Sequence, residues 1–220
     1  MWTRKELKDR CKVVMKRNYW YMFLVSAILA IVVGVPTVTM NYASYSDILI
    51  QKINGLSMLF ALWLWKLPFL ALAFECFIVS PIRYGVVRYY LLNTKKNPDL
   101  KELLFFFNHN YLNTVKIAFY VDVQILLWSF LFIIPGIMKY YEYSMIPYLL
   151  AENPNLNSQQ VFALSKKMMY GEKMNKFVLD LSFIGWELLG GLLVIGTFFV
   201  DPYVKGTEAE FYLKMKNLHL

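Results

Sequence analysis

The sequence predicts an all-α membrane protein in which six transmembrane segments form three helical hairpins, each preceded by a cytoplasmic amphipathic interfacial helix. The first observation behind this prediction is composition, since 58% of the 220 residues are hydrophobic, against roughly 45–50% in a soluble domain. The second is that the excess lies in blocks about as long as a bilayer is thick. The third is a pattern that occurs three times: a polar helix start, a basic half-apolar helix, a long apolar segment and a more polar segment.

The three polar starts are capping signals. In each, the first side chain can accept a hydrogen bond from the helix N-terminus, while the side chain three residues later reaches back. The starts are Thr3-x-x-Glu6, Asp99-x-x-Glu102 and Asn157-x-x-Gln160. They divide a single membrane domain into repeat-like units over about 3–92, 99–152 and 157–214.

The first unit begins with a basic helix over 3–17, which we expect to lie in the membrane interface with its apolar stripe toward the lipid. A first span follows at about 19–39. This stretch is too long for the apolar region of a signal peptide, and Pro36 marks its expected outer end. The polar connection 40–55 is placed outside the cell.

A second apolar block runs from Leu56 to about Leu92, and it is longer than a bilayer core requires. The sequence Lys-Leu-Pro at 66–68 predicts a break, because the residue before a proline is pushed out of the helical region. We therefore expect the second span at about 67–90.

The second unit begins with an amphipathic helix over about 99–109 and continues as a third span at about 113–134. The Ile-Pro-Gly sequence at 134–136 predicts a turn. Residues 137–151 are short and polar for a span. However, only a crossing here places the following basic stretch inside, as the positive-inside rule requires, so we interpret 137–151 as the fourth span.

The third unit begins with a helix over about 157–170, followed by spans at about 175–194 and 197–214. Both chain ends are then cytoplasmic. A second internal repeat supports the last span, because Val-Ser-Pro-x-x-x-Gly at 79–85 matches Val-Asp-Pro-x-x-x-Gly at 200–206.

The spacing shared by the two copies of this second repeat has a physical meaning. Pro81 and Pro202 each remove one backbone donor from their helix. Gly85 and Gly206, four residues later, allow another element to approach closely. An aromatic pair and a leucine follow each glycine.

Several stretches are similar to one known family: WTRKELK at 2–8, PYLLAENPNLNSQQVFALSKKMMYGEK at 147–173, LDLSFIGW at 179–186 and the final proline–glycine–aromatic span. The chain resembles the bacterial integral-membrane family called domain of unknown function nine-seven-five. This resemblance implies a multi-pass protein of the bacterial cytoplasmic membrane and implies no reaction. A fainter similarity is to the membrane part attached to some glycerophosphodiester phosphodiesterases, whose separate catalytic domain has no counterpart here.

Ionisable residues inside the apolar segments form the first candidate site, because each costs about 2.5–3.5 kcal/mol at the centre of a span. The deepest are Glu75, Asp122 and Glu187, and the others are Asp180, Glu142, Lys139, Lys205 and Glu208. Lys139 and Glu142, and likewise Lys205 and Glu208, have the spacing of side chains that meet on one helix. Two interpretations stay open: a polar path or pocket in which the three deepest carboxylates bind a cation, a proton or a lipid amine, or carboxylates that only hydrogen-bond across helices.

Basic residues of the amphipathic helices form the second candidate site, for anionic lipid headgroups or another membrane protein. They are Arg4, Lys5, Lys8, Lys12, Lys166 and Lys167. Simple anchoring in the interface is the alternative. We attribute the net charge of +8 to membrane orientation and lipid contact, and we expect no nucleic-acid partner.

No recognisable catalytic or cofactor-binding motif occurs, and the two cysteines and two histidines lack the spacing of a zinc site. We therefore expect no enzyme activity, no cofactor and no metal. The favoured function is an accessory, scaffold or protective component that acts through helix or lipid contacts. The alternative is a small transporter or permease for a lipid, peptide or ion, because internal repeats are typical of transporters. An intramembrane hydrolase would need an activated nucleophile, and no residue fits that role.

Overall fold

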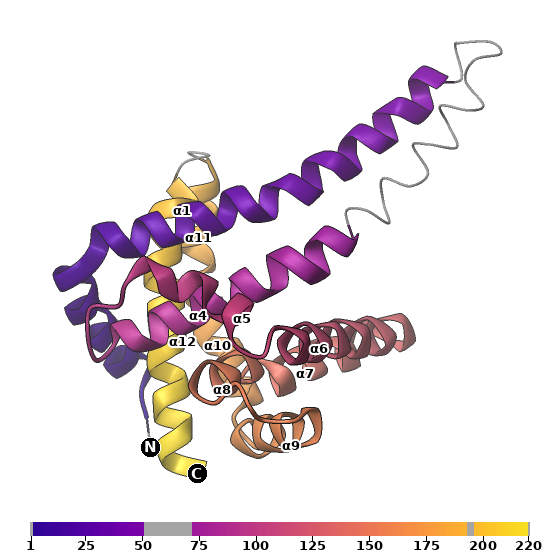
Figure 1. The fold of residues 1–220 in the computed structure, drawn as a ribbon. Coiled ribbons are helices and arrows are strands. Elements are labelled where there is room, and N and C mark those ends of the chain that lie inside the picture. The colour runs from indigo at the N-terminus through magenta and orange to yellow at the C-terminus, as the bar shows by residue number, and fades with distance from the viewer. Residues whose placement is uncertain (1, 51–71, 193–195, 220) are drawn as a thin grey trace.

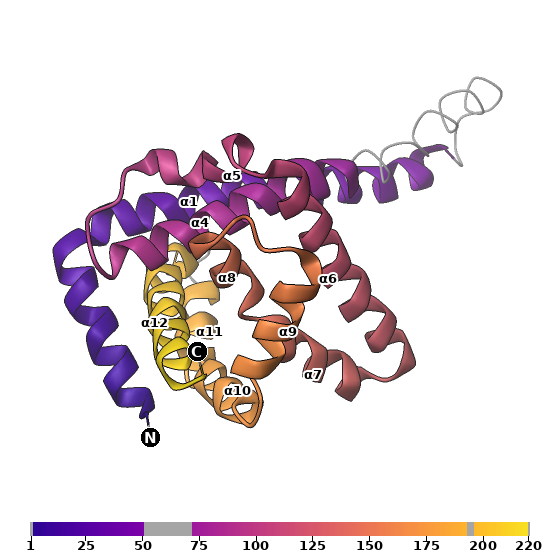
Figure 2. The same ribbon diagram turned by 60° about the horizontal axis from the view of Figure 1, so that its bottom comes forward.

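The computed structural model describes residues 2–50, 72–192 and 196–219 (Figure 1). Within these residues the chain forms helices and turns and no strand, so the predicted all-α class is confirmed. The helix α12 runs through the middle of the molecule with α1, α4, α10 and α11 around it, and the two chain termini lie near one another (Figures 1 and 2).

The helix α1 covers Arg4–Ile50 and bends at Asn18, whose φ of −144° and ψ of 29° are not helical. Thr3 caps its start, accepting a hydrogen bond from the Glu6 amide at 3.2 Å. The bend separates the basic helix from the apolar one, where the sequence predicts the boundary. Figure 2 shows the chain changing direction there.

Pro36 does not end the helix that contains the first predicted span. The helix continues through this position to Ile50, because a proline removes one hydrogen bond but often bends a helix without ending it. Residues 40–50 of the predicted polar connection are therefore helical, and the position of the span's outer end stays a prediction. The rest of that connection, and the break predicted at 66–68, lie outside the described residues.

The next helix is continuous from residue 72, passing through the π-helical turn η1 (Glu75–Val79) into α4 (Ser80–Asn93). The π turn comes directly before Pro81, which cannot donate to the carbonyl of Phe77. The hydroxyl of Tyr111 donates to that carbonyl instead, at 2.7 Å.

The amphipathic helix predicted over 99–109 is replaced by two short elements, the 3₁₀ helix η2 (Leu100–Leu104) and α5 (Phe105–Asn108). Asp99 caps η2 as expected, accepting from the Lys101 amide. The segment lies against α4, where a Cβ on Gly85 would meet the backbone of Leu103. This close contact explains the tight 3₁₀ path.

The following hairpin consists of α6 (Tyr111–Leu131) and α7 (Ile133–Tyr143). The chain turns at Phe132, which is extended with φ −158° and ψ 148°, so the turn predicted at 134–136 is wrong by a few residues. The proline there instead falls in the first turn of α7, where its missing donor costs nothing.

Residues 137–151 are not one helix. The chain turns after α7, at Ser144 and Met145, and continues as α8 (Ile146–Glu152). Neither α7 nor α8, with 11 and 7 residues, is long enough to cross a bilayer core of about 30 Å. A fourth crossing in a single helix is therefore absent.

The third unit begins with α9 (Ser158–Met168), whose start has the complete capping box of Asn157 and Gln160. The predicted fifth span is broken at Ser182 and Phe183 into α10 (Lys173–Leu181) and α11 (Ile184–Leu192). The last helix, α12 (Gly196–His219), is continuous and contains Pro202.

Two of the described helical stretches are long and apolar enough to cross a membrane: Arg4–Gly34 and Tyr111–Leu131. Only 28% and 22% of their most apolar windows are buried, so neither is the enclosed core helix of a soluble protein. The arrangement of six spans in three hairpins stays a prediction.

Candidate functional site

A cavity of about 300 Å³ with a mainly apolar wall lies between α1, α4, α6, α7, α8, α10 and α12. We call it the tyrosine cavity, because five tyrosines line it: Tyr84, Tyr90, Tyr140, Tyr143 and Tyr148. Five charged side chains line it as well: Arg83, Asp122, Lys176, Lys205 and Glu208. Three of these charged residues, Asp122, Lys205 and Glu208, are among the predicted site residues.

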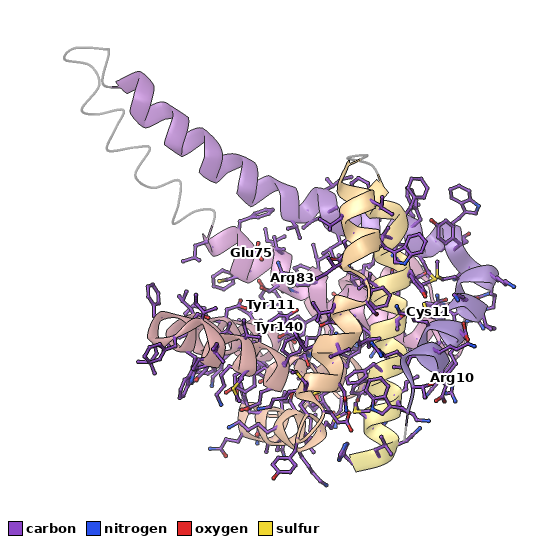
Figure 3. The ribbon with its side chains drawn as sticks, turned by 180° about the vertical axis from the view of Figure 1, so that it is seen from behind. Arg10, Cys11, Glu75, Arg83, Tyr111 and Tyr140 are labelled. Atoms are coloured by element: carbon purple, nitrogen blue, oxygen red, sulfur yellow. The ribbon has the colours of Figure 1, made fainter. Side chains whose placement is uncertain are left out.

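Arg83 pairs with one of the predicted carboxylates at one side of the cavity and lies close to a second. Its guanidinium donates to Glu75 Oε1 at 2.5 Å. Asp122 forms no ion pair with a described residue, although it is attracted by the charge of Arg83 and repelled by that of Glu75. Figure 3 shows Glu75 and Arg83 on the same helical segment, with Tyr140 nearby. Sequence analysis missed Arg83, although an arginine inside an apolar segment is itself a signal.

Lys176 is the most enclosed charge at the cavity, with 3% of its surface exposed. Its ammonium group donates to Asp180 Oδ1 at 2.5 Å and to Glu208 Oε1 at 2.8 Å. A buried lysine needs such partners, because an unpaired buried charge is costly. Lys176 was missed as a site residue, and its spacing of four from Asp180 is the signal that could have found it.

The expected contact between Lys205 and Glu208 is absent. Lys205 instead pairs with Asp201, one turn earlier on α12, while Glu208 reaches across to Lys176 on α10. Tertiary packing thus overrides the local spacing, because a partner on a neighbouring helix competes for the same carboxylate.

The expected contact between Lys139 and Glu142 is present, at 2.8 Å. Glu142 also accepts from Lys173 at 2.6 Å and lies 3.8 Å from Lys166. Only 9% of Glu142 is exposed. These four residues form a second ion-paired cluster, which fastens α7 to α9 and to the start of α10.

The three deepest predicted carboxylates do not converge. Glu75 and Asp122 lie together around Arg83, but Glu187 is exposed on α11 and does not line the tyrosine cavity. Within the described part of the chain it forms no ion pair. The break between α10 and α11, which the sequence does not predict, changes where Glu187 lies.

The tyrosine hydroxyls differ in their partners. The Tyr90 hydroxyl donates to the Met22 carbonyl at 2.9 Å and lies 2.8 Å from Ser26 Oγ. Tyr84 has only 5% of its surface exposed, yet its hydroxyl forms no hydrogen bond with another described residue. The Tyr84 hydroxyl is not among the enclosed polar atoms without a partner, so it is open to the cavity that Tyr84 lines.

The basic start of α1 forms a separate hollow of about 420 Å³, lined by Arg4, Lys5, Lys8, Asp9, Lys12 and Ser182. Lys8 lies 4.2 Å from the centre of the Phe183 ring and donates to the Ser182 carbonyl at 3.4 Å. Partial burial, together with the nearby charges of Arg4 and Lys12, lowers the pKa of Lys8.

The other two basic candidates lie elsewhere, on α9. Lys166 is near Glu142, as above, and Lys167 is exposed with no ion pair to a residue that the structure describes. The six predicted basic residues therefore do not form one surface.

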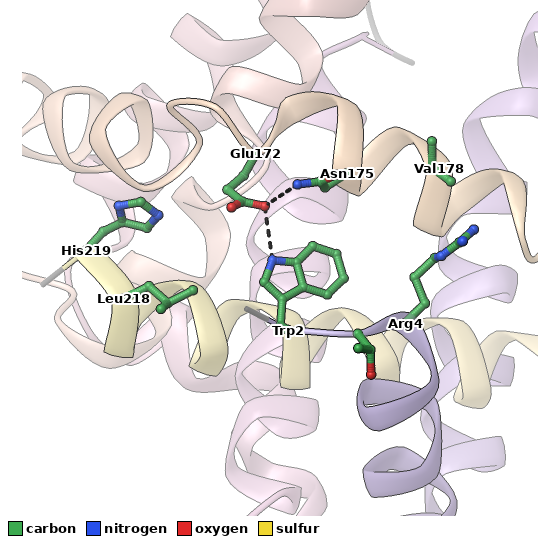
Figure 4. A pocket seen from close by; sticks show the side chains of 8 residues that line it. Trp2, Arg4, Glu172, Asn175, Val178, Leu218 and His219 are labelled. Carbon is green, nitrogen blue, oxygen red and sulfur yellow. Dashed lines mark hydrogen bonds between the residues drawn. The ribbon is translucent and has the colours of Figure 1, made fainter.

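A third hollow of about 520 Å³ lies where the two chain ends meet (Figure 4). There Glu172 Oε2 accepts from Trp2 Nε1 at 3.0 Å and from Asn175 Nδ2 at 2.9 Å. The Trp2 ring also meets Phe211 edge to face, with centroids 5.2 Å apart. These contacts fasten the N-terminus to α10 and α12.

The prolines and glycines of the second repeat occupy comparable environments. A Cβ on Gly206 would lie 2.5 Å from Cys11 Sγ, so both Gly85 and Gly206 permit a close contact with another element. Before Pro202, the Tyr19 hydroxyl lies 3.4 Å from the Phe199 carbonyl.

Among residues 2–50, 72–192 and 196–219, no three His, Cys, Asp or Glu side chains come together as ligands for a metal ion. The arrangement at the tyrosine cavity can therefore bind through charge, hydrogen bonds and aromatic faces.

The family described as protein of unknown function (DUF975) matches residues 132–219. This match confirms the resemblance predicted from the sequence, over the part of the chain that holds Lys176, Lys205 and Glu208. Similarity to glycerophosphodiester phosphodiesterases is not shown. No curated protein and no solved structure matches the chain.

Proposed function

We propose that the chain is a multi-pass protein of the bacterial cytoplasmic membrane that acts by binding lipid or another membrane protein, as an accessory, scaffold or protective component, and that it catalyses no reaction. The family match does not indicate any reaction, since that family is described only as of unknown function. The observation that carries the proposal is the tip of the α6–α7 hairpin.

The hairpin tip is a continuous apolar surface. Its large apolar residues run from Leu126 to Ile134, and each has between 38% and 81% of its surface exposed. The helix that leads to this tip has 21 residues, or about 32 Å at 1.5 Å per residue, which is the thickness of a bilayer core. A soluble monomer rarely exposes so large an apolar patch, so this hairpin supports membrane insertion.

The charges of the helical body support a binding role over a catalytic one. Lys176 is held between two carboxylates, and Glu142 is held among three lysines. Groups fixed in this way hold helices together and are not free to act as a nucleophile or a base.

The basic hollow at the start of α1 supports contact with anionic headgroups. Arg4, Lys5 and Lys8 have no carboxylate partner among the described residues, and together they line one surface. Clustered cations next to an apolar helix attract the anionic lipids of a membrane surface.

Cysteine labelling of intact cells tests the membrane arrangement. In a chain with Cys11→Ala and Cys76→Ala, Ser44→Cys is placed in the predicted outside connection and Asn153→Cys in a predicted inside one. An impermeant maleimide should label Ser44→Cys in intact cells and Asn153→Cys only after permeabilisation. Labelling of Asn153→Cys in intact cells overturns the six-span scheme, and recovery of the chain outside the membrane fraction overturns the membrane proposal.

A small transporter or permease is the second candidate, and the tyrosine cavity favours it. Alternating access needs a polar site between helices, and here Asp122 and Arg83 lie at such a site. A transport phenotype that is lost in Asp122→Asn, with normal membrane abundance, would favour the transporter. Retention of that phenotype, together with recovery of a membrane-protein partner in mild detergent, would favour the scaffold.

A further inference from the structure

We infer that the tyrosine cavity binds the ammonium group of an organic amine. This inference goes beyond the proposed function, which assigns the cavity no ligand, and it does not depend on the number of membrane crossings. Three independent features of the cavity carry it: the balance of charge, the groups without a partner, and the aromatic walls.

The cavity and its ion-pair partners carry more acid than base. Arg83, Lys176 and Lys205 are the three cations at the wall, and each is already bonded to a carboxylate. The carboxylates of the same set number five: Glu75, Asp122, Asp180, Asp201 and Glu208. The five charged residues that line the cavity carry +1 by themselves, and the set reaches −2 only with the three partner carboxylates, which do not line it. Because each wall cation and Glu208 is already ion-paired, Asp122 is the wall charge left without an ion pair among the described residues, and a cationic ligand would pair with it.

Two of the polar groups at the wall lack a partner. Asp122 forms no hydrogen bond or ion pair with another described residue, and its electrostatic neighbour Arg83 is already bonded to Glu75. Tyr84 has 5% of its surface exposed, and its hydroxyl has no hydrogen-bond partner among the described residues and is open to the cavity. A carboxylate only accepts hydrogen bonds and an ammonium group only donates them, so an amine satisfies both groups at once.

The aromatic rings favour an organic cation. Five tyrosines line one small space, and the electron-rich face of a tyrosine ring attracts a cation. In the described part of the chain no three metal-ligating side chains come together, which disfavours a metal ion as the bound cation. The volume of about 300 Å³ is at the lower end for small-molecule pockets, so it suits a headgroup or a small amine.

The same ammonium chemistry has two sources, an aminophospholipid headgroup and a free amine. Asp122 and Arg83 are both exposed, and Asp122 lies on α6, the helix that ends in the apolar tip. The cavity therefore opens beside the surface that we propose to meet lipid. A headgroup could enter from that surface, whereas a free amine would enter from water.

The experiment compares two single-charge variants of the full-length protein. Asp122→Asn removes the unpaired carboxylate at the cavity. Glu187→Gln removes an exposed carboxylate that lies on α11 and does not line the cavity, so it is the matched control. A third variant, Tyr84→Phe, removes only the hydroxyl, and thermal unfolding of all three reports whether each still folds.

The first measurement places the protein in nanodiscs that contain phosphatidylethanolamine or phosphatidylglycerol. Native mass spectrometry then measures how much of each lipid the protein retains and how tightly. The second measures stabilisation of the detergent-solubilised protein by ethanolamine, with ethylene glycol as the uncharged control. Loss of a charge-assisted hydrogen bond should weaken amine binding about 10-fold or more in Asp122→Asn. Tyr84→Phe should weaken binding by a few-fold, and Glu187→Gln should leave it unchanged.

Each outcome decides the proposal. Selective retention of phosphatidylethanolamine that depends on Asp122 supports the inference with a lipid source. Stabilisation by ethanolamine alone that depends on Asp122 supports it with a free amine. Equal binding of both lipids and no effect of ethanolamine overturns the inference, and so does a folded Asp122→Asn protein that binds amines as tightly as the wild type. The labelling of Asn153→Cys tests the membrane arrangement without reference to the cavity. The membrane proposal and the amine-binding proposal can therefore be rejected separately.

Discussion

The helices α4 and α12 carry the two copies of the Pro-x-x-x-Gly repeat, and they use one sequence frame for different contacts. The match pairs Tyr84 of α4 with Lys205 of α12. It also pairs Val87 with Glu208, and all four of these side chains line the tyrosine cavity. Matching positions on two helices therefore face the same space.

The difference between the copies lies in what fills these positions. At the matched positions α4 presents a tyrosine and a valine, whereas α12 presents a lysine and a glutamate. The charged wall of α12 depends on counter-ions, including Lys176 on another helix, whereas α4 packs closely against Leu103 at Gly85. The charge that α4 brings to the cavity, Arg83, lies at the position that matches Val204 and pairs with Glu75. The comparison teaches that one backbone pattern can carry its charges at different positions in its two copies.

The largest expected effect comes from removing the counter-ion of α12. Lys176→Met leaves Asp180 and Glu208 without their shared partner, and breaking a buried pair costs about 3–5 kcal/mol. The measurement is thermal or denaturant unfolding of the purified protein in detergent. Lys167→Met, at an exposed position, is the matched control and should change stability by less than about 0.5 kcal/mol.

A second change then sharpens this result. Adding Glu208→Gln to Lys176→Met removes one of the two stranded carboxylates and should recover part of the lost stability. If Lys176→Met is as stable as Lys167→Met, the charged wall does not depend on its counter-ion and the comparison between the copies is wrong.

The next effect comes from adding a methyl group at the two repeat glycines. Gly85→Ala places a Cβ against the Leu103 backbone, which cannot rotate away, so overpacking should cost about 3 kcal/mol. Gly206→Ala meets the ends of the Cys11 and Met22 side chains, which can shift, so it should cost about 1 kcal/mol.

Unfolding midpoints of the two alanine variants provide the measurement. Cys11→Ala should relieve the smaller effect when it is combined with Gly206→Ala, and no second side-chain change should relieve Gly85→Ala. Equal losses for the two glycines would contradict the distinction between Gly85, which packs against backbone, and Gly206, which packs against side chains that can shift.

A smaller effect concerns two tyrosine hydroxyls that contact carbonyls near the prolines. Only the Phe77 carbonyl lies four residues before its proline, whereas Phe199 lies three residues before Pro202. Tyr111→Phe removes a 2.7 Å hydrogen bond to the Phe77 carbonyl, which Pro81 cannot satisfy, so it should destabilise by about 1 kcal/mol. Tyr19→Phe removes a contact of 3.4 Å to the Phe199 carbonyl and should have less effect. Calorimetric unfolding of the two variants measures which one loses more stability. A larger loss for Tyr19→Phe than for Tyr111→Phe would contradict this prediction.

The smallest effect is one of pH at the contact between α1 and α12. A hydrogen bond from Lys214 lowers the pKa of Glu6 below the ordinary value of 4.5. A carboxyl whose pKa is lower when folded stabilises the fold above its unfolded pKa and loses this contribution as the pH falls through the folded pKa. Wild type should therefore exceed Glu6→Gln in melting temperature at neutral pH, with the gap closing well below pH 4.5. A gap that is constant with pH would exclude this ionic contribution.

The local features of the fold were predictable because short-range chemistry determines them. The caps at Thr3, Asp99 and Asn157 follow from side chains that satisfy the first amides of a helix. The bend at Asn18 falls where a basic sequence becomes an apolar one. The break at Ser144 has a local signal that was not used, because Pro147 cannot donate to the carbonyl of Tyr143, where α7 ends. The break at Ser182 has no proline beside it and was not predicted.

The sequence predicted several residues of the candidate site, but it did not predict which of them form ion pairs with one another. Asp122, Lys205 and Glu208 were expected because charges in apolar segments need a reason. Lys176 was missed because its second partner lies 32 residues away in sequence, on α12. Distances between helices of this kind depend on how α10 ends, and that end is itself set by packing.

Cys11, which packs against Gly206, allows the contact between α1 and α12 to be followed in solution by thiol modification. Cys11 is fully enclosed, and burial raises the pKa of its thiol to about 12, so it resists thiol reagents while the two helices stay together. Any modification of Cys11 would then report that the basic N-terminal arm has swung away. The rate at which the Cys11 thiol is modified therefore measures how often α1 separates from α12.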